Sequence, residues 1–195
     1  MKKIFIILST IFFIYSCDVA KQISGAYNLS QCTYDYNSIN NIKVAGVNLG
    51  KGKSLSIADI ASLSTILSGG NLQTIPFSMT LNLNVKNPNQ TAAYLNGLEY
   101  LIELNDMEFS TGSLDVPLHI NPGEEALLPL SIGLDLKNLI NRYSQDRVTS
   151  EMSRFLGISP GQTKVSVKLW PKMLIGNTPI KSPAHIPITF LFGGK

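Results

Sequence analysis

The sequence predicts a mainly β protein, an antiparallel β-sandwich of about 7–8 strands with added helices near residues 57–68 and 135–157. Two observations lead to this prediction. Apolar and polar residues alternate over several short segments, which is the period of a strand with one buried face. Clusters of Asn, Pro and Gly separate these segments at short intervals, as turns do in sandwich folds.

The first 16 residues resemble a secretory signal peptide. Lys2 and Lys3 precede an apolar run over residues 4–15 that is too short to span a bilayer, which takes about 20 residues. The run ends in Ile14-Tyr15-Ser16-Cys17, which resembles a bacterial lipobox, where the cysteine is acylated before cleavage. We therefore expect a lipid such as palmitate on Cys17 and attachment to a membrane. An ordinary cleaved signal with an incidental Cys17 is the alternative.

The mature chain divides into a lipid-anchored tether over 17–39, with room for a short helix, and a single domain over 40–195. Lys2 and Lys3 are two of the 16 basic residues, so the mature span, with 13 acidic residues, is nearly neutral. This balance lacks the basic patch of a nucleic-acid-binding protein. If Cys17 is acylated, Cys32 is the one remaining thiol and an internal disulfide is excluded.

A strand is expected from Asn40 onward, and the change of apolar phase across Ala45-Gly46 predicts a bulge. A helix over 57–68 follows, with Ser56 as its cap and Gly69-Gly70 at its end.

The clearest strand comes next, because six apolar residues share one phase and polar residues fill the other. The inward residues are Ile75, Phe77, Met79, Leu81, Leu83 and Val85. The outward residues are Ser78, Thr80, Asn82 and Asn84. The strand ends at Asn87-Pro88-Asn89, where proline removes a backbone donor and asparagine favours a turn.

Two hairpins are expected after it. In the first, the strand over 98–104 returns after the tight turn Asn105-Asp106. In the second, residues 116–120 and 128–134 pair around a type II turn at 121–124, where Pro and Gly occupy the second and third positions.

The final third begins with a helical stretch over 135–157, for which Asp135 is a suitable cap. Two more alternating strands, 165–169 and 186–192, complete the predicted sandwich.

Four elements in order resemble the late embryogenesis abundant type 2 family, which includes the water-stress and hypersensitive-response domain. They are the strand with its Asn-Pro-Asn end at 81–89, Leu-Asn-Gly-Leu-Glu-Tyr at 95–100, Leu-Asn-Asp at 104–106 with Gly112 after it, and Asn-Pro-Gly at 121–123. The resemblance covers roughly residues 40–195. Together with the lipobox, it looks like the variant found in lipoproteins of Bacteroidetes-type bacteria.

The resemblance implies a sandwich like fibronectin type III or immunoglobulin domains, an association with stress protection, and no known catalytic site. Some relatives are associated with membrane or lipid contact. Because a fold does not fix a function, any task taken from the family is an analogy.

The residues themselves offer little catalytic equipment. His119 and His185 lie far apart in sequence, and neither has an Asp, Glu or Cys at ligand spacing, so we expect neither catalysis nor a metal there. Glu99 and Glu103 share one strand phase, which is typical of a solvated face rather than an acid–base pair. Cys32 has no basic neighbour and is interpreted as structural or incidental. We expect a protein that is not an enzyme and needs no cofactor.

Three residues are candidate interaction positions: Trp170, Pro88 and Gly112. Trp170 lies out of phase with Leu169, so its ring faces either a partner or the helices of 135–157, and packing against those helices is the favoured alternative.

Two functions remain open. The first is a non-catalytic binding or scaffold module of the cell envelope, with stress as its setting, that contacts another envelope protein through a sandwich edge or loop tips. The second is a carrier of a lipid or other hydrophobic ligand, with the two helical segments over an apolar cavity of roughly 300 Å3 or more. We expect the protein to be anchored at the periplasmic face of the outer membrane. Under the enterobacterial sorting rule, Asp18 after the cysteine would instead favour retention in the inner membrane.

Overall fold

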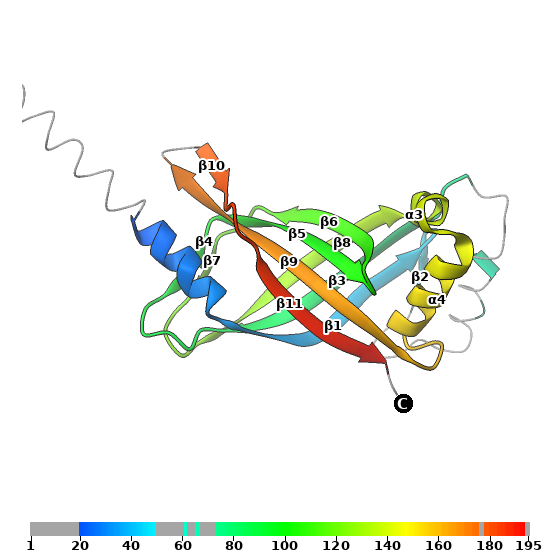
Figure 1. The fold of residues 1–195 in the computed structure, drawn as a ribbon, viewed down its shortest axis with the longest axis horizontal. Coiled ribbons are helices and arrows are strands. Elements are labelled where there is room, and N and C mark those ends of the chain that lie inside the picture. The colour runs from blue at the N-terminus through cyan, green and yellow to red at the C-terminus, as the bar shows by residue number, and fades with distance from the viewer. Residues whose placement is uncertain (1–19, 50–60, 62–64, 67–72, 176–177, 194–195) are drawn as a thin grey trace, which may run out of the picture.

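The computed structural model describes residues 20–49, 61, 65–66, 73–175 and 178–193, and its strands form two antiparallel sheets around a shared core (Figure 1). The predicted mainly β, sandwich-like fold is confirmed. The first sheet has the order β2–β1–β3–β8, from Val47–Asn48, Thr33–Val44, Pro76–Lys86 and Glu125–Asp135.

The second sheet has the order β10–β9–β5–β6, and β11 also pairs with β9. Its strands are β5 (Gly97–Leu104), β6 (Met107–Leu114), β9 (Gln162–Ile175), β10 (Thr178–Lys181) and β11 (Ile186–Gly193). A separate pair joins β4 (Ala93–Leu95) to β7 (Leu118–Ile120). The described chain thus has more strands than predicted, because β2, β4 and β10 are too short to display a period.

The core is built on β3, which lies between β1 and β8. The inward side chains predicted from its alternation are buried, and Phe77 meets Phe109 of the opposite sheet edge-on at 5.6 Å between ring centroids. One outward residue differs from the prediction. Asn82 is only 4 % exposed, since the flanking strands cover it, and its amide donates to the Ser38 hydroxyl at 3.1 Å.

The first predicted hairpin is confirmed, because β5 and β6 pair around Asn105 and Asp106, which both have positive φ. The second is wrong. The type II turn exists, with φ of 76° at Gly123, but β7 pairs with β4 whereas β8 pairs with β3. Alternation shows which face of a strand is buried and carries no information on its neighbour.

The N-terminal part of the domain also needs correction. β1 begins at Thr33, so residues 33–39 belong to the sheet rather than to a tether, and residues 20–30 form a helix. The expected bulge at Ala45-Gly46 is instead a two-residue turn, with positive φ at both positions, that joins β1 to β2.

The expected helical stretch over 135–157 forms two helices, α3 (Leu136–Tyr143) and α4 (Gln145–Phe155), separated at Ser144 by a φ of 82°. Asp135 caps α3 by accepting from Lys137 N at 2.9 Å. The other expected helix, 57–68, lies outside the described residues except for positions 61, 65 and 66, which are helical.

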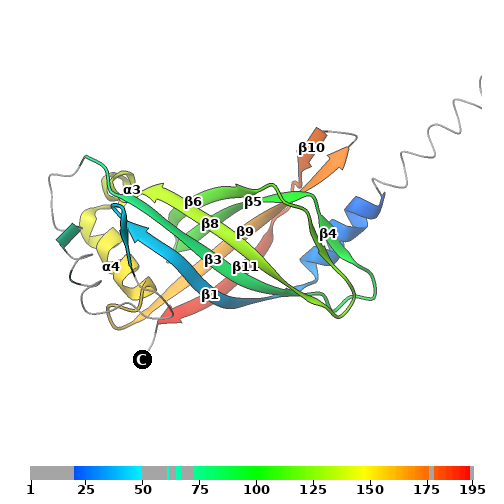
Figure 2. The ribbon, with the colours of Figure 1, turned by 180° about the vertical axis from the view of Figure 1, so that it is seen from behind.

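The two helical parts occupy opposite ends of the molecule. Helix 20–30 lies beside β4 and β7, and α3 and α4 lie at the far end with β2 (Figures 1 and 2). None of the helices in the described part of the chain has the length and apolar character needed to cross a membrane.

Two adjacent leucines of β8 test the assignment of faces. Leu128 is 1 % exposed and Leu127 is 51 % exposed. We expect Leu128→Ala to lower the free energy of unfolding by roughly 2–5 kcal/mol, the range for a buried leucine, and Leu127→Ala to lower it by about 1 kcal/mol or less. Urea denaturation of both variants measures this. Equal losses would contradict the arrangement of the core.

Candidate binding groove beside helix 20–30

The Asn-Pro-Asn loop after β3 contains a buried hydrogen-bond centre. Asn87 has no exposed surface, and its side-chain nitrogen donates to Thr91 O at 3.0 Å and Ile120 O at 2.9 Å. Its Oδ1 accepts from Asn89 N at 3.0 Å. Asn87 therefore links the loop to β7, and both ends of its amide are satisfied.

The backbone of Asn87 continues the link into the type II turn. Its N–H donates to Glu124 O at 3.0 Å, and its carbonyl accepts from Gly123 N at 2.8 Å. The loop before β4 and the turn before β8 are thus held against each other.

The same loop holds the C-terminal part of helix 20–30. The Asn89 amide donates to Asn28 O at 2.9 Å. The Asn28 amide donates to Thr91 Oγ1 at 2.6 Å and Ala92 O at 2.9 Å. The helix is consequently fixed at this end through asparagines on both sides of the contact.

The N-terminal part of the helix is held by Gln22. Its Oε1 accepts from Leu174 N of β9 at 2.5 Å and from the Asn96 amide at 2.9 Å. Two separate regions of the sandwich therefore bind the first turns of the helix.

Between these two attachments the helix lies close to β4 because of a glycine. A Cβ at Gly25 would lie 2.8 Å from Tyr94 Cβ, closer than side chains normally approach. Leu29 is buried in the core, and Cys32, just after the helix, is buried with its Sγ 3.4 Å from Asn28 O. Burial raises the pKa of the Cys32 thiol, so the interpretation of Cys32 as structural fits this environment.

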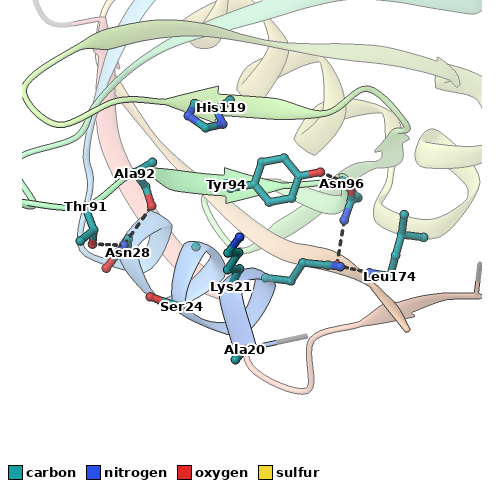
Figure 3. A pocket seen from close by; sticks show the side chains of 12 residues that line it. Ala20, Lys21, Ser24, Asn28, Thr91, Ala92, Tyr94, Asn96, His119 and Leu174 are labelled. Carbon is teal, nitrogen blue, oxygen red and sulfur yellow. Dashed lines mark hydrogen bonds between the residues drawn. The ribbon is translucent and has the colours of Figure 1, made fainter. Parts of the chain in front are cut away.

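Helix 20–30 and β4 enclose a half-open groove with a volume of about 810 Å3 (Figure 3). Its lining combines small and aromatic residues with amides, hydroxyls, one lysine and one histidine. The described residues that line it are Ala20, Lys21, Gln22, Ser24, Gly25, Asn28, Thr91, Ala92, Tyr94, Asn96, His119 and Leu174. No carboxylate is among these lining residues.

The two histidines have separate environments. His119 lies at the groove, with its Nε2 3.1 Å from Asn121 Oδ1 and its ring 6.0 Å from that of Tyr94. His185 lies 5.2 Å from the Trp170 ring, measured between centroids. Across the described residues, no group of three His, Cys, Asp or Glu side chains is placed to hold a metal ion.

Of the predicted interaction residues, Trp170 and Gly112 line one hollow of about 530 Å3 that is formed by residues of β5, β6, β9 and β10. Pro88 is exposed on the loop after β3 and does not line it. The preferred packing of Trp170 against the helices of 135–157 is wrong. Its ring contacts Lys181, whose Nζ lies 4.5 Å from the ring centroid, and His185.

Ion pairs surround this hollow. Glu99 binds Lys181 at 2.6 Å and approaches Lys172 at 3.7 Å, and Glu103 binds Lys168 at 2.8 Å. The hydrogen bond from Lys181 is the main reason that the pKa of Glu99 is lowered. Each glutamate is thus paired with lysine and not with the other glutamate, as expected for a solvated face rather than an acid–base pair.

Gly112 makes room for a link between the sheets. The Tyr100 ring lies over it, so a Cβ at Gly112 would overlap the ring and its hydroxyl. The hydroxyl donates to the carbonyl of Ser131 on β8. The absence of a side chain at Gly112 on β6 therefore allows the Tyr100 link from β5 to β8.

The described residues form a mainly β domain with added helices and a groove beside helix 20–30. A comparison with sequence families matches residues 82–182, just over half of the chain, to the family described as late embryogenesis abundant protein. The chain belongs to this family, as its Asn-Pro-Asn strand end and later motifs predicted. The family is one of stress-related domains that are generally non-enzymatic.

The search of curated proteins found no match. Among solved structures, a protein from Archaeoglobus fulgidus is similar at 16% identity and a TM-score of 0.39, covering 83% of this chain and 98% of that one. The solution structure of a late embryogenesis abundant protein has 8% identity and a TM-score of 0.35, covering 96% and 88%. A β-D-glucoside glucohydrolase from Trichoderma reesei has 11% identity and a TM-score of 0.28, and covers 84% of this chain against 19% of that enzyme.

The residues that attach helix 20–30 were missed by sequence reasoning. Gln22 and Asn28 are common surface residue types, and their partners lie more than 60 positions away in sequence. The available signal was the helical spacing of Ile23, Ala26 and Tyr27, which indicates a helix without indicating what it packs against.

We expect Gly25→Val to detach helix 20–30 from β4, because even its first side-chain carbon would overlap Tyr94. Ser24→Val is the matched control, since Ser24 is exposed and the helix propensity of valine is common to both variants. Hydrogen exchange should show fast exchange of the amides of residues 20–30 in Gly25→Val alone. Equal protection in the two variants would show that close approach at Gly25 does not hold the helix.

Proposed function

We propose that the chain is a non-catalytic lipoprotein of the cell envelope that binds another envelope protein through the groove beside helix 20–30. Cys17 carries the lipid in this proposal, and the described helix begins three residues later. In this proposal the lipid is inserted in the outer membrane, and the domain is held close to the periplasmic face of that membrane.

The observation that carries the proposal is the attachment of helix 20–30 at both ends. Gln22 and Asn28 hold the helix from two directions, so the groove is formed before any partner arrives. A preformed site avoids the entropy cost of ordering the surface on binding.

The lining favours a polypeptide over a reaction substrate. Lys21 and Ser24 on one wall, and Tyr94 with His119 on the other, offer hydrogen bonds beside an aromatic surface. A loop of another protein presents both polar backbone groups and apolar side chains, which suits such a wall. The carrier of a lipid or hydrophobic ligand remains a second candidate, because the groove volume of about 810 Å3 is within the range of small-molecule sites. This groove lies at the opposite end of the molecule from α3 and α4, which were expected to cover the ligand.

Site-specific photocrosslinking in cells tests the proposal. A photoreactive phenylalanine analogue replaces Ser24, which lines the groove, and in a control replaces Val47, which is 44 % exposed on β2 at the far end. We expect a protein adduct from position 24 and none from position 47. An adduct with the mass of a lipid from position 24 would favour the carrier, and no difference between the positions would contradict a role for the groove.

A further inference from the structure

Helix 20–30 has a second face that the sandwich does not cover. Gly25 and Leu29 are turned toward the domain and are buried. Ile23 and Tyr27 are 55 % and 65 % exposed, and their spacing of four residues places them on one side of the helix. These two residues do not line the groove, but they adjoin it, because Ala20 and Ser24, which do line it, neighbour Ile23 and Tyr27 on the helix surface.

The short distance from the expected anchor limits where this face can be. Ala20 is three residue steps from Cys17, and an extended chain of that length spans at most about 11 Å. Tyr27 lies about 10 Å further along the helix at 1.5 Å per residue. If Cys17 carries acyl chains in the bilayer, both exposed side chains are within reach of its surface.

Rigid attachment makes this proximity persistent. The helix is bound to the sandwich through Gln22 and Asn28, so it does not act as a free linker. Its composition also suits a membrane surface. Residues 20–30 contain no acidic side chain and one basic side chain, Lys21, so lipid phosphates do not repel it.

We propose that the face formed by Ile23 and Tyr27 rests in the headgroup layer of the bilayer that holds the lipid on Cys17. Isoleucine is removed from water there, and tyrosine is enriched at membrane interfaces because it combines an apolar ring with a polar tip. The inference rests on the proposed lipoprotein function and adds an orientation to it.

The orientation follows from the position of the helix. The end of the sandwich with β4 and β7 faces the membrane, and α3, α4 and the β1–β2 turn point away from it (Figures 1 and 2). The part of the groove formed by Lys21 and Asn28 lies off the membrane-facing side, because these two residues are turned away from Ile23 around the helix.

Single-tryptophan variants of the full-length lipidated protein test this inference. Trp170 is the one tryptophan of the chain, so Trp170→Phe gives a silent background. Tyr27→Trp in this background is the probe, Ile23→Trp is a second probe on the same face, and Val47→Trp is the distal control. The proteins are reconstituted in phosphatidylcholine vesicles that contain some phosphatidylglycerol and brominated lipid.

We expect both probes to show a blue-shifted emission and quenching by brominated lipid several-fold stronger than that of the control at position 47. Quenching at positions 23 and 27 no stronger than at position 47 would overturn the inference.

A separate arm isolates the lipoprotein proposal. Metabolic labelling with an alkyne fatty acid should mark the natural chain and not Cys17→Ala, and the labelled protein should float with vesicles. If labelling persists in Cys17→Ala, the anchor assignment fails. If labelling and flotation behave as expected but the probes remain in water, only the orientation fails.

Discussion

The buried amide of Asn87 is the interaction on which this end of the molecule depends. A primary amide removed from water must have its donors and acceptor satisfied, and here Thr91, Ile120 and Asn89 supply the partners. The bonds to Thr91 and Asn89 close the loop between β3 and β4 on itself, and the bond to Ile120 joins the loop to β7. The loop and β7 are therefore held against each other.

That arrangement is what positions helix 20–30. Asn89 donates to the helix at Asn28 O, and Thr91 receives the Asn28 amide, so the loop held by Asn87 becomes the surface on which the helix rests. The close approach at Gly25 then brings the helix against Tyr94 of β4, beside the groove. The groove is thus formed by polar contacts at the end of the sandwich.

Sequence reasoning recovered the parts of the fold that burial specifies. The alternation of Phe77, Leu81 and Leu83 predicted the central strand because each of these side chains enters the core. Sequence reasoning failed where hydrogen bonds between segments distant in sequence determine the arrangement of loops and strands. Asn87 was interpreted only as a turn residue, and the pairing of β7 with β4 was missed because both strands are too short for a period. The groove could not be predicted, because its lining residues are far apart in the sequence and become neighbours only after folding.

A double-mutant cycle between Asn87→Ala and Asn28→Ala tests most directly whether the loop and the helix form one unit. Both side chains bind Thr91, one at its carbonyl and the other at its hydroxyl. If the account is correct, urea denaturation of the two single variants and the double variant gives a coupling energy of about 1 kcal/mol or more. Asn84→Ala, which has no partner in common with Asn28, provides the control pair. Additive losses, within about 0.5 kcal/mol, would contradict the account.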